Sequence, residues 1–208
     1  MIRAAAGAAA LVAGGCVWNA RPPVEPQQPA EAVVLLESTT MPQPIRRIAR
    51  HAFFLVKPAG APGWTSVEFG FVPRNDVRLH AVWRGAEAER AIACLHEHAP
   101  ALDEEIGARY LPWPGPNSNT FVDRLLRLCS LHADLPATAI GKDYRGLIGA
   151  SFTSGGTGLQ LETPIFGLRI GLTEGIELHL FALAFGVDWW PPALIVPIDP
   201  GRVGFDDR

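Results

Sequence analysis

Alternating and clustered apolar positions in the first part of the folded chain predict β-strands. Residues 51–57 and 64–72 are rich in β-branched and aromatic side chains. They flank the segment "PAGAPG", whose Pro and Gly residues are typical of a hairpin loop. Residues 76–83 alternate polar and apolar side chains, which indicates a further strand. We therefore expect a three-stranded meander over 51–83, preceded by a short strand-like run that begins near Val33.

Two later segments change to helical spacing. Residues 85–99 place one apolar stripe on a helix, formed by Ala88, Ala91, Ile92 and Leu95. The same spacing runs from Ser118 to about Leu131, through Phe121, Val122, Leu125, Leu126 and Cys129. We expect these two helices to pack on the sheet.

The last third of the chain returns to a period of two. The segments "TGLQLET", "FGLRIGL" and "GIELHLFALAFGV" alternate and are separated by Gly, which predicts two or three strands, the last largely buried. The tail that follows is broken by Pro. We expect its Trp189–Trp190 pair to pack against the domain, and contact of an exposed pair with lipid or a partner is the alternative. Strands, then helices, then strands predict an α+β fold, an antiparallel sheet with packed helices.

The first 32 residues follow none of these patterns. Residues 1–16, "MIRAAAGAAALVAGGC", combine one Arg, a short apolar stretch and small residues before a cysteine, as a secretory signal does. The ending resembles a bacterial lipobox, which implies lipidation of Cys16; a plain signal or an uncleaved anchor remains open. Residues 17–32 are rich in Pro, Gln and Ala and predict an extended tether. We expect one globular domain over 33–208, exported and either periplasmic or anchored to the membrane through the N-terminus.

Composition narrows the classes of function. The 208 residues are 48% hydrophobic and 19% charged, as in globular domains. A net charge of −3, with no large basic cluster, argues against nucleic-acid binding. Cys94 and Cys129 lie in the helical patterns, where we expect buried thiols; a disulfide stays open if the chain is exported. No spacing of residues predicts a metal or cofactor site.

Candidate chemistry gathers where the second helix begins. Asn117, Ser118 and Asn119 are all residue types that cap a helix, which is worth about 1 kcal/mol. A helix N-terminus also stabilises developing negative charge, so a hydroxyl placed there is suited to act as a nucleophile. We expect the Ser118 hydroxyl to cap the helix whether or not it also acts as a nucleophile. The sequence leaves this second role undecided.

A nucleophile needs a base, and the base needs a partner that orients it. His51 stands at the head of the first meander strand, and Glu68 on the returning strand is expected to lie beside it. The predicted catalytic set is Ser118, His51 and Glu68, with Asn117 or Asn119 polarising a carbonyl oxygen. In the segment "AIGKDY", Lys142 and Tyr144 are candidates for substrate contacts, and a turn with a surface ion pair is the alternative.

The segments "HAFFLV" and "NSNTFV" resemble the circularly permuted papain-like fold of lecithin–retinol acyltransferase-like proteins and bacterial cell-wall amidases. The resemblance implies a His on an early strand, a polar residue on the next and a nucleophile at the start of a later helix. The nucleophile of those proteins is Cys, whereas this chain has Ser118. That departure leaves open a serine hydrolase or a scaffold that binds without cleaving.

A longer resemblance rests on "HAFFLVKPAGA", "WPGPNSNTFVDRLLR", "LPATAIGKDY" and the C-terminal segments from "SGGTGLQLET" onward. On these motifs the chain is identified as a member of a bacterial family catalogued as a domain of unknown function, which implies no chemistry.

Two hypotheses about function follow from the candidate catalytic set and the predicted export. The first is an envelope amidase or acyl hydrolase acting on peptidoglycan peptide or lipid acyl groups. The second is a non-catalytic envelope binding or structural protein. A Ser118–His51 separation of about 2.6–3.2 Å would favour the first hypothesis. A much longer separation, or a fully buried Ser118 with no adjoining cleft, would favour the second.

Overall fold

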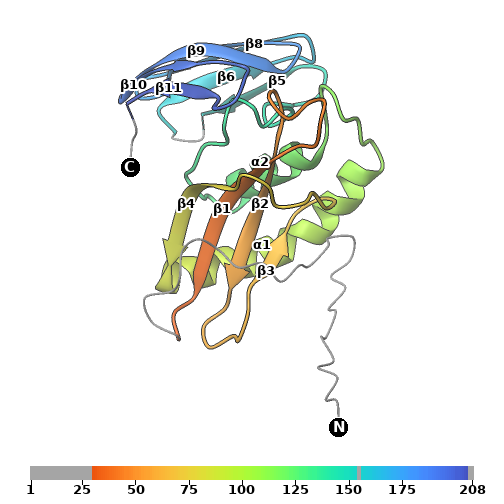
Figure 1. Ribbon diagram of the computed structural model, residues 1–208, viewed down its shortest axis with the longest axis vertical. Coiled ribbons are helices and arrows are strands. Elements are labelled where there is room, and N and C mark those ends of the chain that lie inside the picture. The colour runs from red at the N-terminus through yellow and green to blue at the C-terminus, as the bar shows by residue number, and fades with distance from the viewer. Residues whose placement is uncertain (1–29, 154–155, 206–208) are drawn as a thin grey trace.

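The computed structural model describes residues 30–153 and 156–205. They form two antiparallel sheets with two helices (Figure 1), which confirms the α+β class. The predicted signal, Cys16 and most of the predicted tether lie outside the described residues. Within those ranges, neither helix is long and apolar enough to span a membrane.

The first sheet has four strands in the order β3-β2-β1-β4. Its strands are β1 (Val33–Thr40), β2 (Arg50–Lys57), β3 (Thr65–Val67) and β4 (Arg78–Arg84). The predicted meander is wrong in its order, because β1 lies between β2 and β4. All eight residues of β1 are buried, so this strand takes a central place in the sheet.

Both helices cover one face of this sheet. Helix α1 (Gly85–Gly107) continues beyond the predicted end, and α2 (Ser118–Leu128) begins at the predicted residue. Phe54 of β2, Leu95 of α1 and Phe121 of α2 share one buried apolar core. A disulfide between Cys94 and Cys129, with Cα atoms 5.7 Å apart, joins the two helices. The expected free thiols are therefore absent, because the helix packing brings the two cysteines together.

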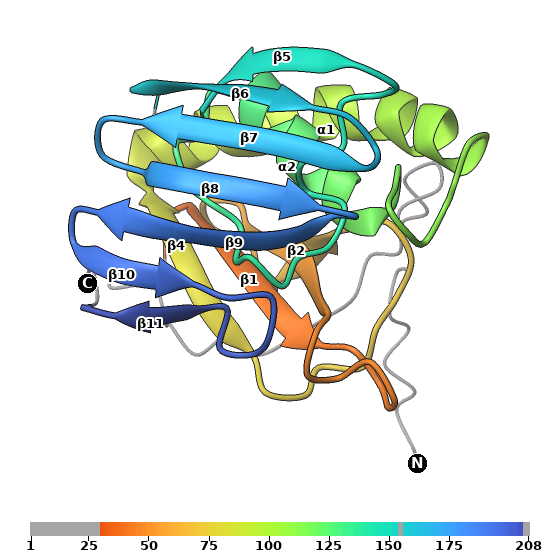
Figure 2. The ribbon, with the colours of Figure 1, turned by 90° about the horizontal axis from the view of Figure 1, so that it is seen from above.

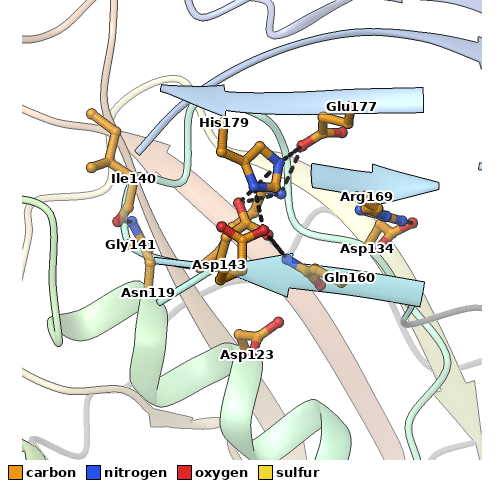
Figure 3. Close-up of polar contacts among 12 residues, drawn as sticks. Asn119, Asp123, Asp134, Ile140, Gly141, Asp143, Gln160, Arg169, Glu177 and His179 are labelled. Atoms are coloured by element: carbon orange, nitrogen blue, oxygen red, sulfur yellow. Dashed lines mark hydrogen bonds and ion pairs between the residues drawn. The ribbon is translucent and has the colours of Figure 1, made fainter. Parts of the chain in front are cut away.

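The second sheet has seven strands in the order β11-β10-β9-β8-β7-β6-β5 (Figure 2). They are β5 (Gly149–Phe152), β6 (Gly158–Glu162), β7 (Phe166–Gly171), β8 (Gly175–Leu180), β9 (Leu183–Trp189), β10 (Pro192–Ile195) and β11 (Arg202–Gly204). The prediction of two or three strands is too low. Helix α2 lies beneath the inner face of this sheet (Figures 1 and 3).

The faces of the second sheet are the reverse of the usual arrangement. Along β8, Glu177 and His179 are buried on the inner face, while Leu178 is 46% exposed on the outer face. The prediction that these apolar residues are largely buried is wrong. The tail is exposed as well, with Trp190 at 78%. A period of two tells which residues share a face but not which face is covered.

Candidate active site

The start of α2 is fixed by Asn117 rather than by Ser118. The Asn117 side chain accepts hydrogen bonds from the backbone N–H groups of Asn119 and Thr120, and the Thr120 hydroxyl accepts from the Asn117 N–H. This reciprocal pair satisfies the N–H groups of Asn119 and Thr120 in the first turn of the helix. The expectation that the Ser118 hydroxyl caps the helix is therefore wrong, and this hydroxyl points to another partner.

That partner is His51. Its Nδ1 lies 3.1 Å from Ser118 Oγ, and its Nε2 lies 2.8 Å from Glu68 Oε2. His51 and Glu68 are buried, whereas Ser118 is partly exposed. A neutral imidazole with its proton on Nε2 donates to Glu68 and leaves the Nδ1 lone pair facing the hydroxyl. The arrangement of the three residues is that of a nucleophile, a base and an orienting carboxylate.

Two further residues hold Glu68 in place. Ser66 Oγ donates to Glu68 Oε1 at 2.8 Å, and the guanidinium of Arg74 donates to the same oxygen. Arg74 also stacks on Phe53, with 3.5 Å from its Cζ to the ring centroid. Burial alone would raise the pKa of Glu68, but the hydrogen bonds from His51 and Arg74 hold it below its ordinary value. Glu68 is therefore a carboxylate at neutral pH.

No pattern in the sequence predicts the role of Arg74. It lies in an irregular segment six residues after Glu68. Only the folded loop brings its guanidinium back onto the carboxylate.

The two amides flanking Ser118 are used for structure. Asn119 Oδ1 accepts from the Ala52 N–H at 2.9 Å, and its Nδ2 donates to the carbonyls of Arg50 and Ile140, each at 2.9 Å. Asn117 Nδ2 likewise donates to two carbonyls, those of Pro112 and Ile140. An amide nitrogen has two hydrogens, so neither side chain has one left for a substrate oxygen in this arrangement.

The segment "AIGKDY" docks on the same helix start. The Thr120 hydroxyl donates to the Gly141 carbonyl at 2.6 Å. Gly141 has a φ of +89°, and a Cβ there would lie 2.3 Å from the Asn117 amide nitrogen, so this close approach requires glycine. Tyr144 packs against Gly115 in the loop that leads into α2. The two signature segments of the sequence are thus one structural unit.

Lys142 faces the second sheet. It is buried, and its ammonium lies 2.8 Å from Asp143 Oδ2 and 3.2 Å from Glu177 Oε1. These two carboxylates outweigh the effect of burial and raise the pKa of Lys142 above its ordinary value. The alternative of a surface ion pair is wrong because Lys142 is buried, and the predicted substrate contact of Lys142 stays a prediction. Its role is to tie the "AIGKDY" segment to β8.

His179 lies at the centre of an ionic cluster (Figure 3). The cluster consists of Lys142, Asp143, Glu162, Glu177 and His179. His179 Nδ1 lies 2.5 Å from Glu162 Oε1, and its Nε2 lies 2.7 Å from Glu177 Oε1. With a carboxylate facing each ring nitrogen, a doubly protonated imidazolium donates to both of them. Burial lowers the pKa of His179, but the charge of Asp143 and the two hydrogen bonds outweigh it and raise the pKa to about 10. The sequence placed His179 on a strand without predicting this cluster.

The same cluster offers a ligand set of the kind that metals bind. Side-chain ligand atoms of Asp143, Glu177 and His179 lie within 4.8 Å of one another. However, the Lys142 ammonium bridges Asp143 and Glu177, and His179 donates through both nitrogens. The carboxylates are already paired with these cations, so the arrangement serves to hold the second sheet on the rest of the fold.

A surface hollow of about 530 Å³ opens beside the candidate site. It is lined by Thr40, Met41, Pro42, Gln43, Arg46, Arg74, Asn75 and Asp76. The hollow shares Arg74 with the site, whereas Ser118 and His51 are not among its lining residues.

Comparison with known families identifies the chain. A model of a family described as a protein of unknown function, DUF3750, matches residues 31–144, which is more than half of the 208 residues. The chain belongs to the DUF3750 family. The matched region contains Ser118, His51 and Glu68 and ends at Tyr144, before β5, so the C-terminal segments of the sequence resemblance lie outside it. No curated protein and no solved structure matches the chain.

Proposed function

We propose that this protein is a serine-dependent amidase or acyl hydrolase. The observation that supports the proposal is the pair of contacts at His51, 3.1 Å to Ser118 Oγ and 2.8 Å to Glu68 Oε2. The first distance falls in the range of about 2.6–3.2 Å for a nucleophile and its base. The resemblance to permuted papain-like proteins remains a prediction and is not needed for this argument.

In the proposed mechanism, His51 Nδ1 takes the proton of the Ser118 hydroxyl while Oγ attacks a carbonyl carbon. Glu68 keeps the other imidazole proton on Nε2 and stabilises the imidazolium that forms. Since the amides of Asn117 and Asn119 and the backbone N–H groups of Asn119 and Thr120 are engaged, the oxyanion is assigned to the backbone N–H of Ser118 at the first position of α2. The imidazolium then protonates the leaving group, and water activated by His51 hydrolyses the acyl-enzyme.

The proposed location is supported by the cysteines and the N-terminal pattern. The Cys94–Cys129 disulfide supports an oxidising compartment. Residues 1–16 resemble a signal that ends in a lipidated Cys16. We therefore place the protein in the bacterial envelope, with membrane attachment through its N-terminus. Peptidoglycan peptide bonds and lipid acyl groups are the substrate classes available there.

The test is labelling of the purified full chain with a fluorophosphonate probe, which reacts with activated serines. We expect labelling of the wild type and loss of labelling in Ser118→Ala and His51→Ala. Ser151→Ala is the matched control, because Ser151 is also partly exposed but lies on the second sheet. Absence of labelling in a wild type that circular dichroism shows to be folded would overturn the serine mechanism.

A non-catalytic binding protein is the second candidate. It is favoured by the hollow beside Arg74, which does not reach Ser118, and by the engagement of both asparagine amides in structural bonds. In that case the wild type and Ser118→Ala would both remain unlabelled.

A further inference from the structure

The outer face of the seven-stranded sheet is apolar throughout. Of the outward strand residues, thirteen are large hydrophobics that are at least 40% exposed: Phe152, Leu159, Leu161, Phe166, Ile170, Ile176, Leu178, Leu180, Phe185, Val187, Trp189, Leu194 and Val203. The charged residues of these strands lie on the inner face or at its edge instead, as Arg169, Glu177 and His179 do. We call these thirteen residues the outer apolar face. Figure 2 looks onto it, and no described helix or strand lies above it.

The register of the strands makes this face continuous. One row crosses all seven strands with its members directly opposite one another: Phe152, Leu159, Ile170, Ile176, Val187, Leu194 and Val203. A second row passes through Leu161, Leu168, Leu178 and Phe185. An antiparallel sheet normally turns its apolar side to the core and its polar side to water. This sheet does the opposite, because its polar side carries the ionic cluster that binds the rest of the fold.

The area of this face is that of a protein interface. Half-exposed side chains of this size each offer on the order of 100 Å². The thirteen residues together therefore offer on the order of 1,000 Å², more than the few hundred Å² of apolar patch that a monomer usually exposes. A standard interface takes about 800 Å² from each partner.

We propose that the outer apolar face binds the same face of a second copy of this chain, forming a closed two-fold dimer. Two sheets pack face to face when their twists match, and a copy has the same twist by construction. With no charge on the strand positions of the face, no like charges meet across the two-fold axis. The resulting double layer of sheets buries both apolar faces and leaves no apolar face for a third copy.

The symmetry identifies the residue at the centre. Strand β8 is the fourth of seven, so a two-fold axis through the middle of the face passes near it. Leu178 is the middle outward residue of β8, paired with Leu168 and Phe185. A charge at Leu178 would therefore face its own copy across the axis. This proposal is independent of the proposed hydrolase, because Ser118, His51 and Glu68 belong to the other part of the fold.

The experiment measures the mass of the full chain, 22.4 kDa as a monomer, by sedimentation equilibrium. The variants are Leu178→Lys, Leu178→Glu and their equimolar mixture. Leu128→Lys is the control, because Leu128 is similarly exposed, at 52%, but lies at the end of α2. We expect wild type and Leu128→Lys to dimerise. Each Leu178 variant alone should dimerise at least about 100-fold more weakly than the wild type, because like charges that face each other are strongly unfavourable. The mixture should restore a dimer of one Lys and one Glu chain.

Three results would overturn the proposal. They are a wild type that is monomeric up to its solubility limit, Leu178 variants that dimerise as the wild type does, and a mixture that stays monomeric. A monomeric wild type that sediments with phosphatidylglycerol vesicles, and loses this binding in Leu178→Glu, would instead assign the face to a lipid surface.

Discussion

The Asn119 side chain holds the β2 backbone on both sides of His51. Its Oδ1 accepts the N–H of Ala52, and its Nδ2 donates to the carbonyl of Arg50, each at 2.9 Å. Because Asn119 follows Ser118 directly in the sequence, these two bonds set the position of the hydroxyl relative to the imidazole. The candidate nucleophile and base, 67 positions apart, are thus aligned by one buried amide.

The first prediction follows from this contact. Asn119→Ala removes three buried hydrogen bonds and leaves backbone groups without partners, so we expect a loss of about 2–4 kcal/mol in the free energy of unfolding. The rate of fluorophosphonate labelling should fall about 10-fold or more, because misplacement of the base by about 1 Å is costly. Urea unfolding and labelling kinetics measure the two effects. Asn75→Ala, at an exposed asparagine, is the control. Unchanged labelling in folded Asn119→Ala would contradict the positioning role.

The second prediction concerns the carboxylate. In Glu68→Gln, the new amide donates a hydrogen bond to His51 Nε2 and moves the imidazole proton to Nδ1, where it faces Ser118. We expect labelling to slow by about 10²–10⁴-fold, because this tautomer does not act as a base. Glu105→Gln, at an exposed carboxylate on α1, should label as the wild type does. A rate within a few-fold of wild type would show that Glu68 has only a structural role.

The adjacency of His51, Glu68 and Ser118 could be predicted because each lies at the end of an element with a clear pattern. The β2 and β3 runs form a hairpin, and the apolar stripe of α2 begins at Ser118. The roles of Arg74 and Asn119 could not be predicted. Both depend on loop and backbone positions that only the tertiary fold brings together.

The turn between β8 and β9 explains in part why the sequence predicted too few strands for the second sheet. Strands β8 and β9 are joined by a tight turn at Phe181 and Ala182, which have φ values of +49° and +60°. Glycine or asparagine normally marks such positions. Here the turn is hidden in the apolar run "HLFALAF", so the sequence predicted one strand where the structure has two.

The third prediction concerns the disulfide. Cys94 and Cys129 are 35 positions apart, and closing a loop of this length stabilises a fold by about 3–4 kcal/mol in the chain-entropy model. We expect the double variant Cys94→Ala/Cys129→Ala to lose stability of this order in urea unfolding. Treatment of the wild type with dithiothreitol should produce a similar loss, and the double variant should not respond to the reductant. A wild type equally stable with and without dithiothreitol would contradict this role.

The last prediction is a pH dependence that arises from His179. Its pKa is raised from an ordinary value of 6.5 to about 10 by the carboxylates of Asp143, Glu162 and Glu177, with Lys142 as the neighbouring cation. The folded chain therefore binds a proton between pH 6.5 and 10 that the unfolded chain has released. The stability that this proton provides is fully present below pH 6.5 and is lost as the pH rises through about 10.

The measurement compares wild type with His179→Gln, so that titration of other groups common to both chains cancels. We expect the wild-type free energy of unfolding to fall relative to that of His179→Gln by more than about 1 kcal/mol between pH 6.5 and 10. His96→Gln is the control, because His96 is exposed on α1 and does not belong to the cluster around His179. Parallel profiles for wild type and His179→Gln would mean that His179 is neutral in the fold. One of its carboxylate neighbours would then have to carry the proton instead.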